Sequence, residues 1–123
     1  MSKKILSVDD SDNTRKWVQF ALKAKGFESI QAEDGLAALE LLKQEPVAAI
    51  ILDINMPRMN GLEFLQKIKA ETAYATIPVV ILSAEGQNED KERAFALGAA
   101  KYIVKPFAPA QLVSALEAVL QGS

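Results

Sequence analysis

Charged residues stand directly after several short apolar runs of this chain, in the places where the strands of a sheet would end. In chain order they are Asp9, Asp10, Asp53 and Lys105. If the runs are parallel strands of one sheet, their carboxyl ends share an edge, and residues far apart in the sequence meet in one crevice. The pattern therefore predicts a site where three carboxylates and one ammonium group converge.

Three carboxylates gathered at one point require a nearby cation. Two like charges about 4 Å apart repel by roughly 4 kcal/mol at an effective dielectric near 20, and such crowding favours protonation of a carboxylate. A hard divalent cation removes this repulsion. Mg2+ is typically held by one or two carboxylates together with phosphate oxygens and water. The residues thus predict a Mg2+ and phosphoryl site, and Mg2+ is the cofactor that we expect.

The composition is that of a soluble globular protein. Of the 123 residues, 50% are hydrophobic and 24% are charged, and the net charge is -2. This length predicts one domain over residues 1–123, and the dispersed lysines argue against nucleic-acid binding. No apolar stretch approaches the length of a membrane span, and the N-terminus has no signal-peptide core. We therefore expect a cytoplasmic protein without membrane insertion.

The chain contains neither cysteine nor histidine. The lack of cysteine excludes disulfides, zinc sites built on thiolates and thiol catalysis. The lack of histidine removes the commonest general base and any phosphohistidine on the chain itself. A phosphohistidine that takes part in the chemistry must therefore belong to a partner protein.

Short runs rich in isoleucine and valine alternate with longer segments of helical period, which predicts repeated βα units around a parallel sheet. The expected strands are residues 4–8, 28–32, 48–52, 78–82 and 101–104. Five such units predict an α/β fold, a flavodoxin-like doubly wound (βα)5 sheet of five parallel strands in the order 2-1-3-4-5. Strands one and three then flank the point where the strand order reverses. The acidic residues lie at that point.

The first helix is expected to begin after Ser11 or Asp12 and to stop at Gly26. The residues expected to pack inward are Trp17, Phe20, Ala21 and Ala24 in this helix, Leu39 and Leu42 in the second, Leu62, Leu65 and Ile68 in the third, Leu112, Leu116, Val119 and Leu120 in the last, and Phe107 before it. Other boundaries are expected at Pro46, Asn60-Gly61, Asn88, Gly98 and Pro109. Lys67 and Lys69 are expected to face solvent.

At this point the sequence resembles a known family, the receiver domain of two-component response regulators, and in particular the stand-alone, chemotaxis-regulator-like type. The similarity covers essentially the whole chain. It rests on Val8-Asp9-Asp10, on the segment 53–61 (DINMPRMNG), on Ser83-Ala84, on Gly98-Ala99 and on the segment 102–107 (YIVKPF). Each motif alone is weak, but all of them in order at the expected strand ends are highly specific.

The resemblance implies a role for each residue of the predicted site. Asp53 would be the phosphoacceptor, a carboxylate nucleophile that forms an aspartyl phosphate. Asp10 and Asp53 would bind Mg2+ directly, together with the backbone carbonyl of Asn55, and Asp9 would act mostly through metal-bound water. Lys105 would pair with a phosphoryl oxygen, as expected for phosphoryl transfer.

The resemblance also implies a switch. Ser83 would donate a hydrogen bond to the phosphoryl group, and Tyr102 would then move from an exposed to a buried rotamer, which reshapes the face made by the fourth helix, fifth strand and fifth helix. The family more often has threonine at the position of Ser83. Asn55 and Glu85 would tune the rate of dephosphorylation. The Lys105-Pro106 peptide resembles the family's cis bond.

Simpler interpretations exist for the single residues. Asp9 and Asp10 could be helix caps, Asp53 a polar strand end, Ser83 a loop hydroxyl and Lys105 a solvated lysine. Tyr102 could likewise be a plain core aromatic. The occurrence of the acids and the lysine together at sister strand ends favours the site.

Three other functions compete with a signalling receiver. An aspartate-nucleophile phosphatase needs a second aspartate two positions after the first, where this chain has Asn55, and usually a larger chain. A flavin or nucleotide binder needs a phosphate-binding loop, and none follows the first run. A docking module that works unphosphorylated would not need the complete acidic set.

We therefore predict a phosphorylation-activated signalling switch that is not an enzyme beyond its own phosphorylation and dephosphorylation. Its expected partners are a sensor histidine kinase or a histidine phosphotransfer protein, and an effector protein that binds the face named above. The sequence ends after the fifth expected helix, so the output is expected to pass through a partner protein, although the chain could also be a receiver module excised from a larger regulator.

Overall fold

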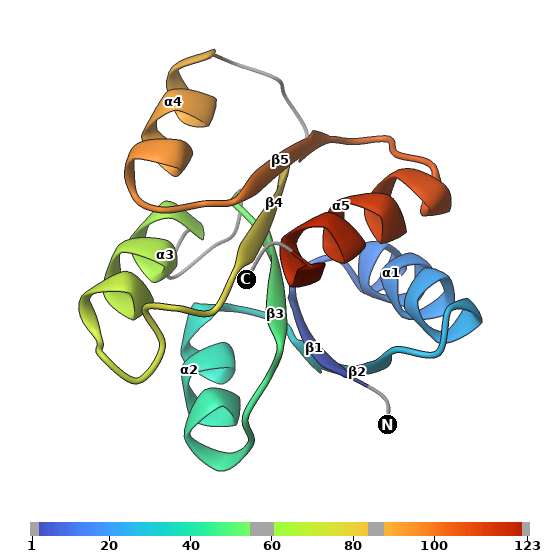
Figure 1. Ribbon diagram of the computed structural model, residues 1–123, viewed down its shortest axis with the longest axis horizontal. Coiled ribbons are helices and arrows are strands. Elements are labelled where there is room, and N and C mark those ends of the chain that lie inside the picture. The colour runs from blue at the N-terminus through green and yellow to red at the C-terminus, as the bar shows by residue number, and fades with distance from the viewer. Residues whose placement is uncertain (1–2, 55–60, 84–87, 122–123) are drawn as a thin grey trace.

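The computed structural model describes residues 3–54, 61–83 and 88–121. Within these residues five strands alternate with five helices (Figure 1). The strands are β1 (Lys4–Val8), β2 (Glu28–Ala32), β3 (Ala49–Asp53), β4 (Val79–Ser83) and β5 (Lys101–Val104). The helices are α1 (Asp12–Ala24), α2 (Gly35–Gln44), α3 (Gly61–Ala70), α4 (Asn88–Ala96) and α5 (Pro109–Gln121).

The strands form one parallel sheet in the order β2-β1-β3-β4-β5, which confirms the predicted fold and topology. Three strands have the predicted bounds, whereas β3 and β4 each begin and end one residue later than predicted. Pro78 has no backbone N–H and so stands before β4. At the other end, the Ile54 N–H donates to the Leu82 carbonyl and carries the pairing of β3 past Asp53.

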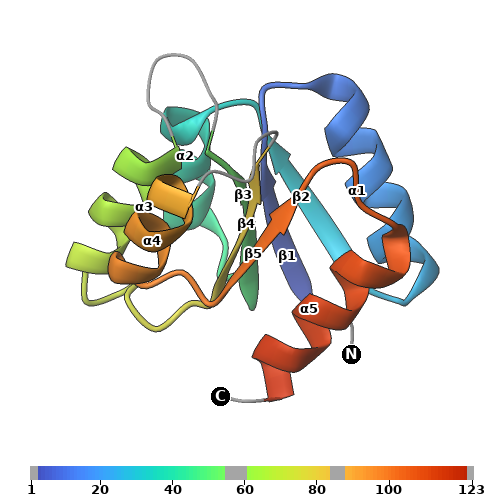
Figure 2. The ribbon, with the colours of Figure 1, turned by 90° about the horizontal axis from the view of Figure 1, so that it is seen from above.

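The helices cover both faces of the sheet (Figure 2). Helices α1 and α5 pack on one face, where a cluster of buried side chains includes Ile5, Leu22 and Leu116. Helices α2, α3 and α4 pack on the other face, where the cluster includes Leu6 and Phe64. Each fully buried aliphatic side chain contributes about 1.5–3 kcal/mol, and β3 and β4 are buried along their whole length. This double coverage explains why their sequences are continuously apolar.

Local sequence sets the helix ends largely as predicted. The Ser11 hydroxyl accepts a hydrogen bond from the Thr14 N–H and caps α1. Helix α2 ends before Pro46, and α3 begins at Gly61; Asn60 lies outside the described residues. Gly98, with φ of +108°, follows α4 in the left-handed region that favours glycine.

Two predictions about side-chain orientation are wrong. Trp17 and Phe20 are 46% and 66% exposed, and they stack on each other with ring centroids 6.5 Å apart. Ala24, also predicted to pack inward, is exposed. The buried face of α1 is rotated by one position and consists of Val18, Ala21 and Leu22. Lys69 does not face solvent either: its Nζ donates to backbone carbonyls of the segment that follows α3.

Other packing predictions are confirmed. Leu62, Leu65 and Ile68 of α3 are buried, as are Leu112 and Leu116 of α5. Phe107 is also buried, and the Lys105-Pro106 peptide is cis. Among the described residues, the helices are too short or too polar to cross a membrane.

Candidate functional site

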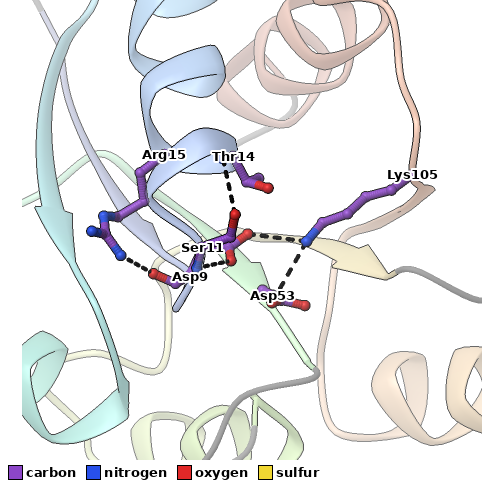
Figure 3. A network of polar contacts seen from close by, with 6 residues as sticks. All are labelled: Asp9, Ser11, Thr14, Arg15, Asp53 and Lys105. Carbon is purple, nitrogen blue, oxygen red and sulfur yellow. Dashed lines mark hydrogen bonds and ion pairs between the residues drawn. The ribbon is translucent and has the colours of Figure 1, made fainter.

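The ends of β1, β3 and β5 bring the predicted site residues together (Figure 3). Val8 of β1 pairs with Leu52 of β3, so the residues that follow them, Asp9 and Asp53, lie at the same edge of the sheet. Lys105 follows β5 and extends across this edge to both carboxylates. The predicted convergence of these three residues is therefore present in the fold.

Asp9 is held by hydrogen bonds through its backbone and through both carboxylate oxygens. Its backbone N–H donates to the Ala32 carbonyl of β2 over 3.0 Å. One carboxylate oxygen accepts from the Ser11 N–H at 2.9 Å, and the other accepts from Lys105 Nζ at 3.1 Å. The residue is only 1% exposed. A buried carboxylate that accepts hydrogen bonds on both of its oxygens is fixed in place.

Lys105 links the two buried acids. Its Nζ lies 3.1 Å from Asp9 Oδ2 and 3.6 Å from Asp53 Oδ2. Both carboxylates are almost completely buried, and the lysine side chain is itself largely covered. One ammonium group stands here among three carboxylates, since Asp10 is adjacent. The local charge is therefore negative, which favours binding of a further cation.

The acidic cluster fits a hard divalent cation. Carboxylate oxygens of Asp9, Asp10 and Asp53 all lie within 4.8 Å of one another. Mg2+ binds oxygen ligands at about 2.0–2.1 Å in an octahedron, which places opposite ligands about 4 Å apart, and it usually keeps several waters. Asp10 is exposed whereas the other two are buried, so the cluster opens to solvent on one side. Its oxygens and spacing match an ion that retains part of its hydration shell.

The predicted switch residues lie on neighbouring strands. Ser83 is the last residue of β4, is 1% exposed and is paired with Val104. Its carbonyl accepts from the Lys105 N–H at 2.7 Å, so the hydroxyl residue and the lysine are tied through the backbone. Tyr102 of β5 is partly buried and packs against the cluster beneath α4. Asn55 and Glu85 lie outside the described residues.

Three further residues have structural roles that we did not predict from the sequence. Arg15 donates from Nη1 to the Asp9 carbonyl at 2.5 Å. Asp34 is buried and caps α2 by accepting from the Ala37 N–H at 2.8 Å. An Asp-Gly pair before an apolar helix was a usable signal for this cap, whereas the contact of Arg15 had no signal in the sequence pattern.

The third of these residues is Gly61, where the neighbouring backbone leaves no room for a side chain. A Cβ added there would lie 2.5 Å from the Asp53 carbonyl oxygen and 2.4 Å from Ile54 Cα. The first turn of α3 therefore approaches the backbone of Asp53 more closely than any other residue type allows.

A groove borders the site on the side of α1. It is lined by Asn13, Thr14 and Trp17 from α1 and by Lys105, Pro106 and Phe107 from the segment after β5. Lys105 thus belongs both to the acidic cluster and to this groove.

The comparisons with known proteins agree with this geometry. Residues 5–117 match the family model of the response regulator receiver domain. The chain belongs to this family. The predicted function, a phosphorylation-activated signalling switch, is confirmed at the level of the family, which does not favour a phosphatase.

Some relatives match this chain over nearly their whole length, and others over about half of it. The chain is 41% identical over 119 residues to a chemotaxis protein CheY homolog of Campylobacter jejuni, covering 95% of this chain and 92% of that protein. It is 38% identical over 121 residues to the phosphate regulon transcriptional regulatory protein PhoB of Escherichia coli, covering 98% of this chain. The chain spans about half of that regulator, 53% of its length.

The fold has close structural relatives as well. The chemotaxis protein CheY4 of Vibrio cholerae superposes with a TM-score of 0.92 at 36% sequence identity, over 97% of this chain and 99% of that one. The predicted receiver architecture is thus found in a solved structure of similar length.

Proposed function

We propose that this receiver domain accepts a phosphoryl group on Asp53, with Mg2+ bound at the adjacent acidic cluster. The donor is a phosphohistidine of a sensor histidine kinase or a histidine phosphotransfer protein, and the signal passes to an effector protein in the cytoplasm. One observation carries this proposal: Asp53 lies buried at a sheet edge, beside a lysine and two further carboxylates.

The chemistry of the proposed transfer is a displacement at phosphorus. A carboxylate oxygen of Asp53 attacks the phosphorus atom, the bond between phosphorus and the donor imidazole nitrogen breaks, and its electron pair remains on the leaving imidazole. This chain has no histidine, so the donor group belongs to the partner. Water later attacks the phosphorus atom, the bond between phosphorus and the Asp53 oxygen breaks, and inorganic phosphate leaves as the carboxylate is regenerated.

Mg2+, when bound, neutralises negative charge on the phosphoryl oxygens and on the nucleophile. Asp10, Asp53 and the backbone carbonyl of Asn55 would hold it directly, and Asp9 would hold one of its waters. The exposure of Asp10 and the burial of Asp9 support this division. Asp9 already uses both of its oxygens for hydrogen bonds to Ser11 and Lys105.

Lys105 would supply the second cation. Its Nζ lies between Asp9 and Asp53, so a phosphoryl group on Asp53 would be within reach of the same ammonium. We propose that the Lys105 ammonium leaves its ion pairs with the two carboxylates and forms a new ion pair with a phosphoryl oxygen. Because this group is held in place before the reaction, little reorganisation is needed when charge develops.

The output would follow from Ser83 and Tyr102. A hydrogen bond from the Ser83 hydroxyl to the phosphoryl group would draw β4 and its following loop inward, and Tyr102 would occupy the space that this movement leaves. The face of α4, β5 and α5 carries exposed apolar side chains, Phe95 and Val104 at 43% and 41% exposure. Such a face suits an effector protein. Asn55 and Glu85 would set the lifetime of the phosphoryl group.

The test is covalent labelling. Purified protein with Mg2+ and acetyl phosphate should gain the mass of one phosphoryl group, and the gain should disappear in Asp53→Asn and after removal of Mg2+ by a chelator. Asp90→Asn on α4 is the matched control and should be labelled normally. Labelling of Asp53→Asn at the wild-type level would contradict the assignment. Sustained turnover of p-nitrophenyl phosphate would instead favour the phosphatase alternative.

A further inference from the structure

Arg15 contacts the site through the backbone of Asp9. Its Nη1 donates to the Asp9 carbonyl oxygen at 2.5 Å, and its Nη2 pairs with the carboxylate of Asp12 (Figure 3 shows the contact with Asp9). The Arg15 side chain is only 17% exposed, whereas that of Asp12 is 75% exposed. The guanidinium is therefore directed toward the site, and the exposed acid orients it from outside.

The held carbonyl belongs to the peptide that joins Asp9 to Asp10. On the other side of Asp9, the N–H is fixed by the Ala32 carbonyl of β2. Arg15 thus completes the restraint of a short segment between the end of β1 and the start of α1. Its own backbone is anchored, because the Arg15 N–H donates to the Ser11 carbonyl in the first turn of α1.

Asp10 has few other restraints. Its side chain is exposed, and within the described residues its carboxylate forms no hydrogen bond or ion pair. The direction of that carboxylate therefore depends on the two peptides that flank Asp10: Arg15 holds the preceding one through the Asp9 carbonyl, and Asp9 Oδ1 holds the following one through the Ser11 N–H. Asp9 differs, because two side-chain hydrogen bonds fix its carboxylate independently of Arg15.

We propose that Arg15 is a positioning residue for the metal cluster: by holding the Asp9 carbonyl, and oriented by Asp12, it directs the Asp10 carboxylate toward Asp53. This inference rests on the proposed function, since it assigns Arg15 to the Mg2+ site proposed there. Arg15 acts through the Asp9-Asp10 peptide and contacts neither the metal nor the phosphoryl group.

Whether the loss of the Arg15 guanidinium weakens or strengthens Mg2+ binding distinguishes a positioning role from a through-space effect of its charge. Removal of a positive charge near a cation site should strengthen Mg2+ binding if the charge acted only through space. Loss of a group that orients a ligand should weaken it, by about 10–100-fold for outer partners of metal ligands. A purely structural role in α1 would lower stability and leave the affinity unchanged.

The experiment measures Mg2+ binding by calorimetry on the whole chain. Arg15→Met should weaken binding about tenfold or more. Arg15→Lys should recover part of the loss, because a lysine can hold the carbonyl but cannot bind Asp12 in the same forked geometry. Asp12→Asn should weaken binding less than Arg15→Met.

Lys43→Met is the matched control. Lys43 forms an exposed pair with Glu40 three residues earlier on α2, with the same spacing as Arg15 and Asp12. This variant removes the same charge and a similar helical pair far from the site, and it should bind Mg2+ like the wild type.

A second readout separates binding from transfer. The Mg2+ concentration that gives half the maximal rate of labelling by acetyl phosphate should rise in Arg15→Met, while the rate at saturating Mg2+ should stay near that of the wild type. Urea unfolding without metal checks that the variant folds; if it does not, Arg15→Lys and Asp12→Asn carry the test.

Two failures are distinguishable. Wild-type protein that takes up no Mg2+ would overturn both the proposed function and this inference. Wild-type protein that binds Mg2+, with Arg15→Met equal or tighter, would overturn the positioning role alone.

Discussion

The two edges of the sheet differ in how their charged side chains are paired. At the carboxyl-terminal edge, Lys105 stands among three carboxylates, two that follow β1 and one at the end of β3. At the amino-terminal edge, Lys4 pairs with the single carboxylate of Glu45 at 2.5 Å. Lys69 donates there to two neutral carbonyls, those of Ala75 and Ile77, at 3.0 and 2.8 Å.

We expect charged residues at the amino-terminal edge to stabilise the fold, and those at the carboxyl-terminal edge to bind an ion and take part in the proposed chemistry. At the amino-terminal edge, Lys4 and Lys69 each have hydrogen-bond partners that the fold provides. The carboxyl-terminal edge keeps an excess of negative charge around the buried carboxylate of Asp53, the proposed phosphoacceptor. Variants at the first edge should therefore change the free energy of unfolding, and variants at the second should change ion binding and phosphorylation.

Gly61→Ala should have the largest effect, because it should lower both the free energy of unfolding and the extent of phosphorylation. The new methyl group would overlap the backbone of Asp53 and Ile54, and we expect a loss of about 3 kcal/mol, at the upper end of overpacking, together with strongly reduced phosphorylation. Gly26→Ala is the control. Gly26 has φ of +82° but open space around it, so alanine should cost about 1–2 kcal/mol and leave phosphorylation unchanged. Equal labelling of both variants would contradict the role given to Gly61.

Lys105→Met should separate metal binding from phosphoryl transfer. Loss of the ammonium removes a cation that competes for Asp9 and Asp53, so calorimetry should show tighter Mg2+ binding. The rate of phosphorylation at saturating Mg2+ should fall about a hundredfold, the effect typical of losing one group that stabilises developing charge. Weaker Mg2+ binding in this variant would argue that Lys105 orients the carboxylates instead of competing for them.

Lys69→Met should change stability alone. The two carbonyls would lose their donor, and we expect a loss of about 1–2 kcal/mol in the free energy of unfolding, measured by urea at neutral pH. Mg2+ affinity and phosphorylation should match the wild type. Lys67→Met, on the exposed side of the same helix, should be close to neutral. A clear loss of Mg2+ binding in Lys69→Met would break the distinction between the two edges.

The smallest predicted effect is a pair of opposite pH dependences at the amino-terminal edge. Burial lowers the pKa of Lys69 below 10.5, so the unfolded chain binds this proton more tightly. The free energy of unfolding should then gain from Lys69 as pH rises from the lowered pKa to about 10.5. This gain should be absent in Lys69→Met.

Lys4 should act with the opposite sign. Its hydrogen bond to Glu45 raises its pKa above 10.5, more than desolvation lowers it, and the charges of Glu45 and Glu28 add to the increase. The stabilisation from this pair is fully present below about pH 10.5 and is lost as pH rises through the raised pKa. Urea unfolding at several alkaline pH values should show these opposite slopes when the wild type is compared with Lys4→Met and Lys69→Met. Slopes of the same sign would contradict the pairing described for one of the two lysines.

The sequence was sufficient to predict the strand order and the position of the acids, for a physical reason. Strands covered on both faces must be apolar along their length, so their ends are clear wherever a charged residue follows, as at Asp9 and Lys105. Asp53 and Ser83 show the limit of this rule. Each is the last residue of its strand and not the first residue after it, because a polar side chain at the edge can be buried when partners are present.

The predictions that failed concern the rotation of a helix and the path of long side chains. The apolar residues of α1 fit two adjacent faces, and the packing of Val18 against the sheet decided between them while Trp17 remained outside. Lys69 and Arg15 bind backbone carbonyls. Carbonyls occur at every residue, so no spacing in the sequence marks such partners.

The exposed aromatic pair on α1 has a practical consequence. Trp17 is the only tryptophan of the chain and lines the same groove as Lys105. Indole emission depends on the electric field and the polarity around the ring. A displacement of the Lys105 ammonium should therefore shift the fluorescence of Trp17, which gives this protein a built-in optical reporter that needs no attached dye.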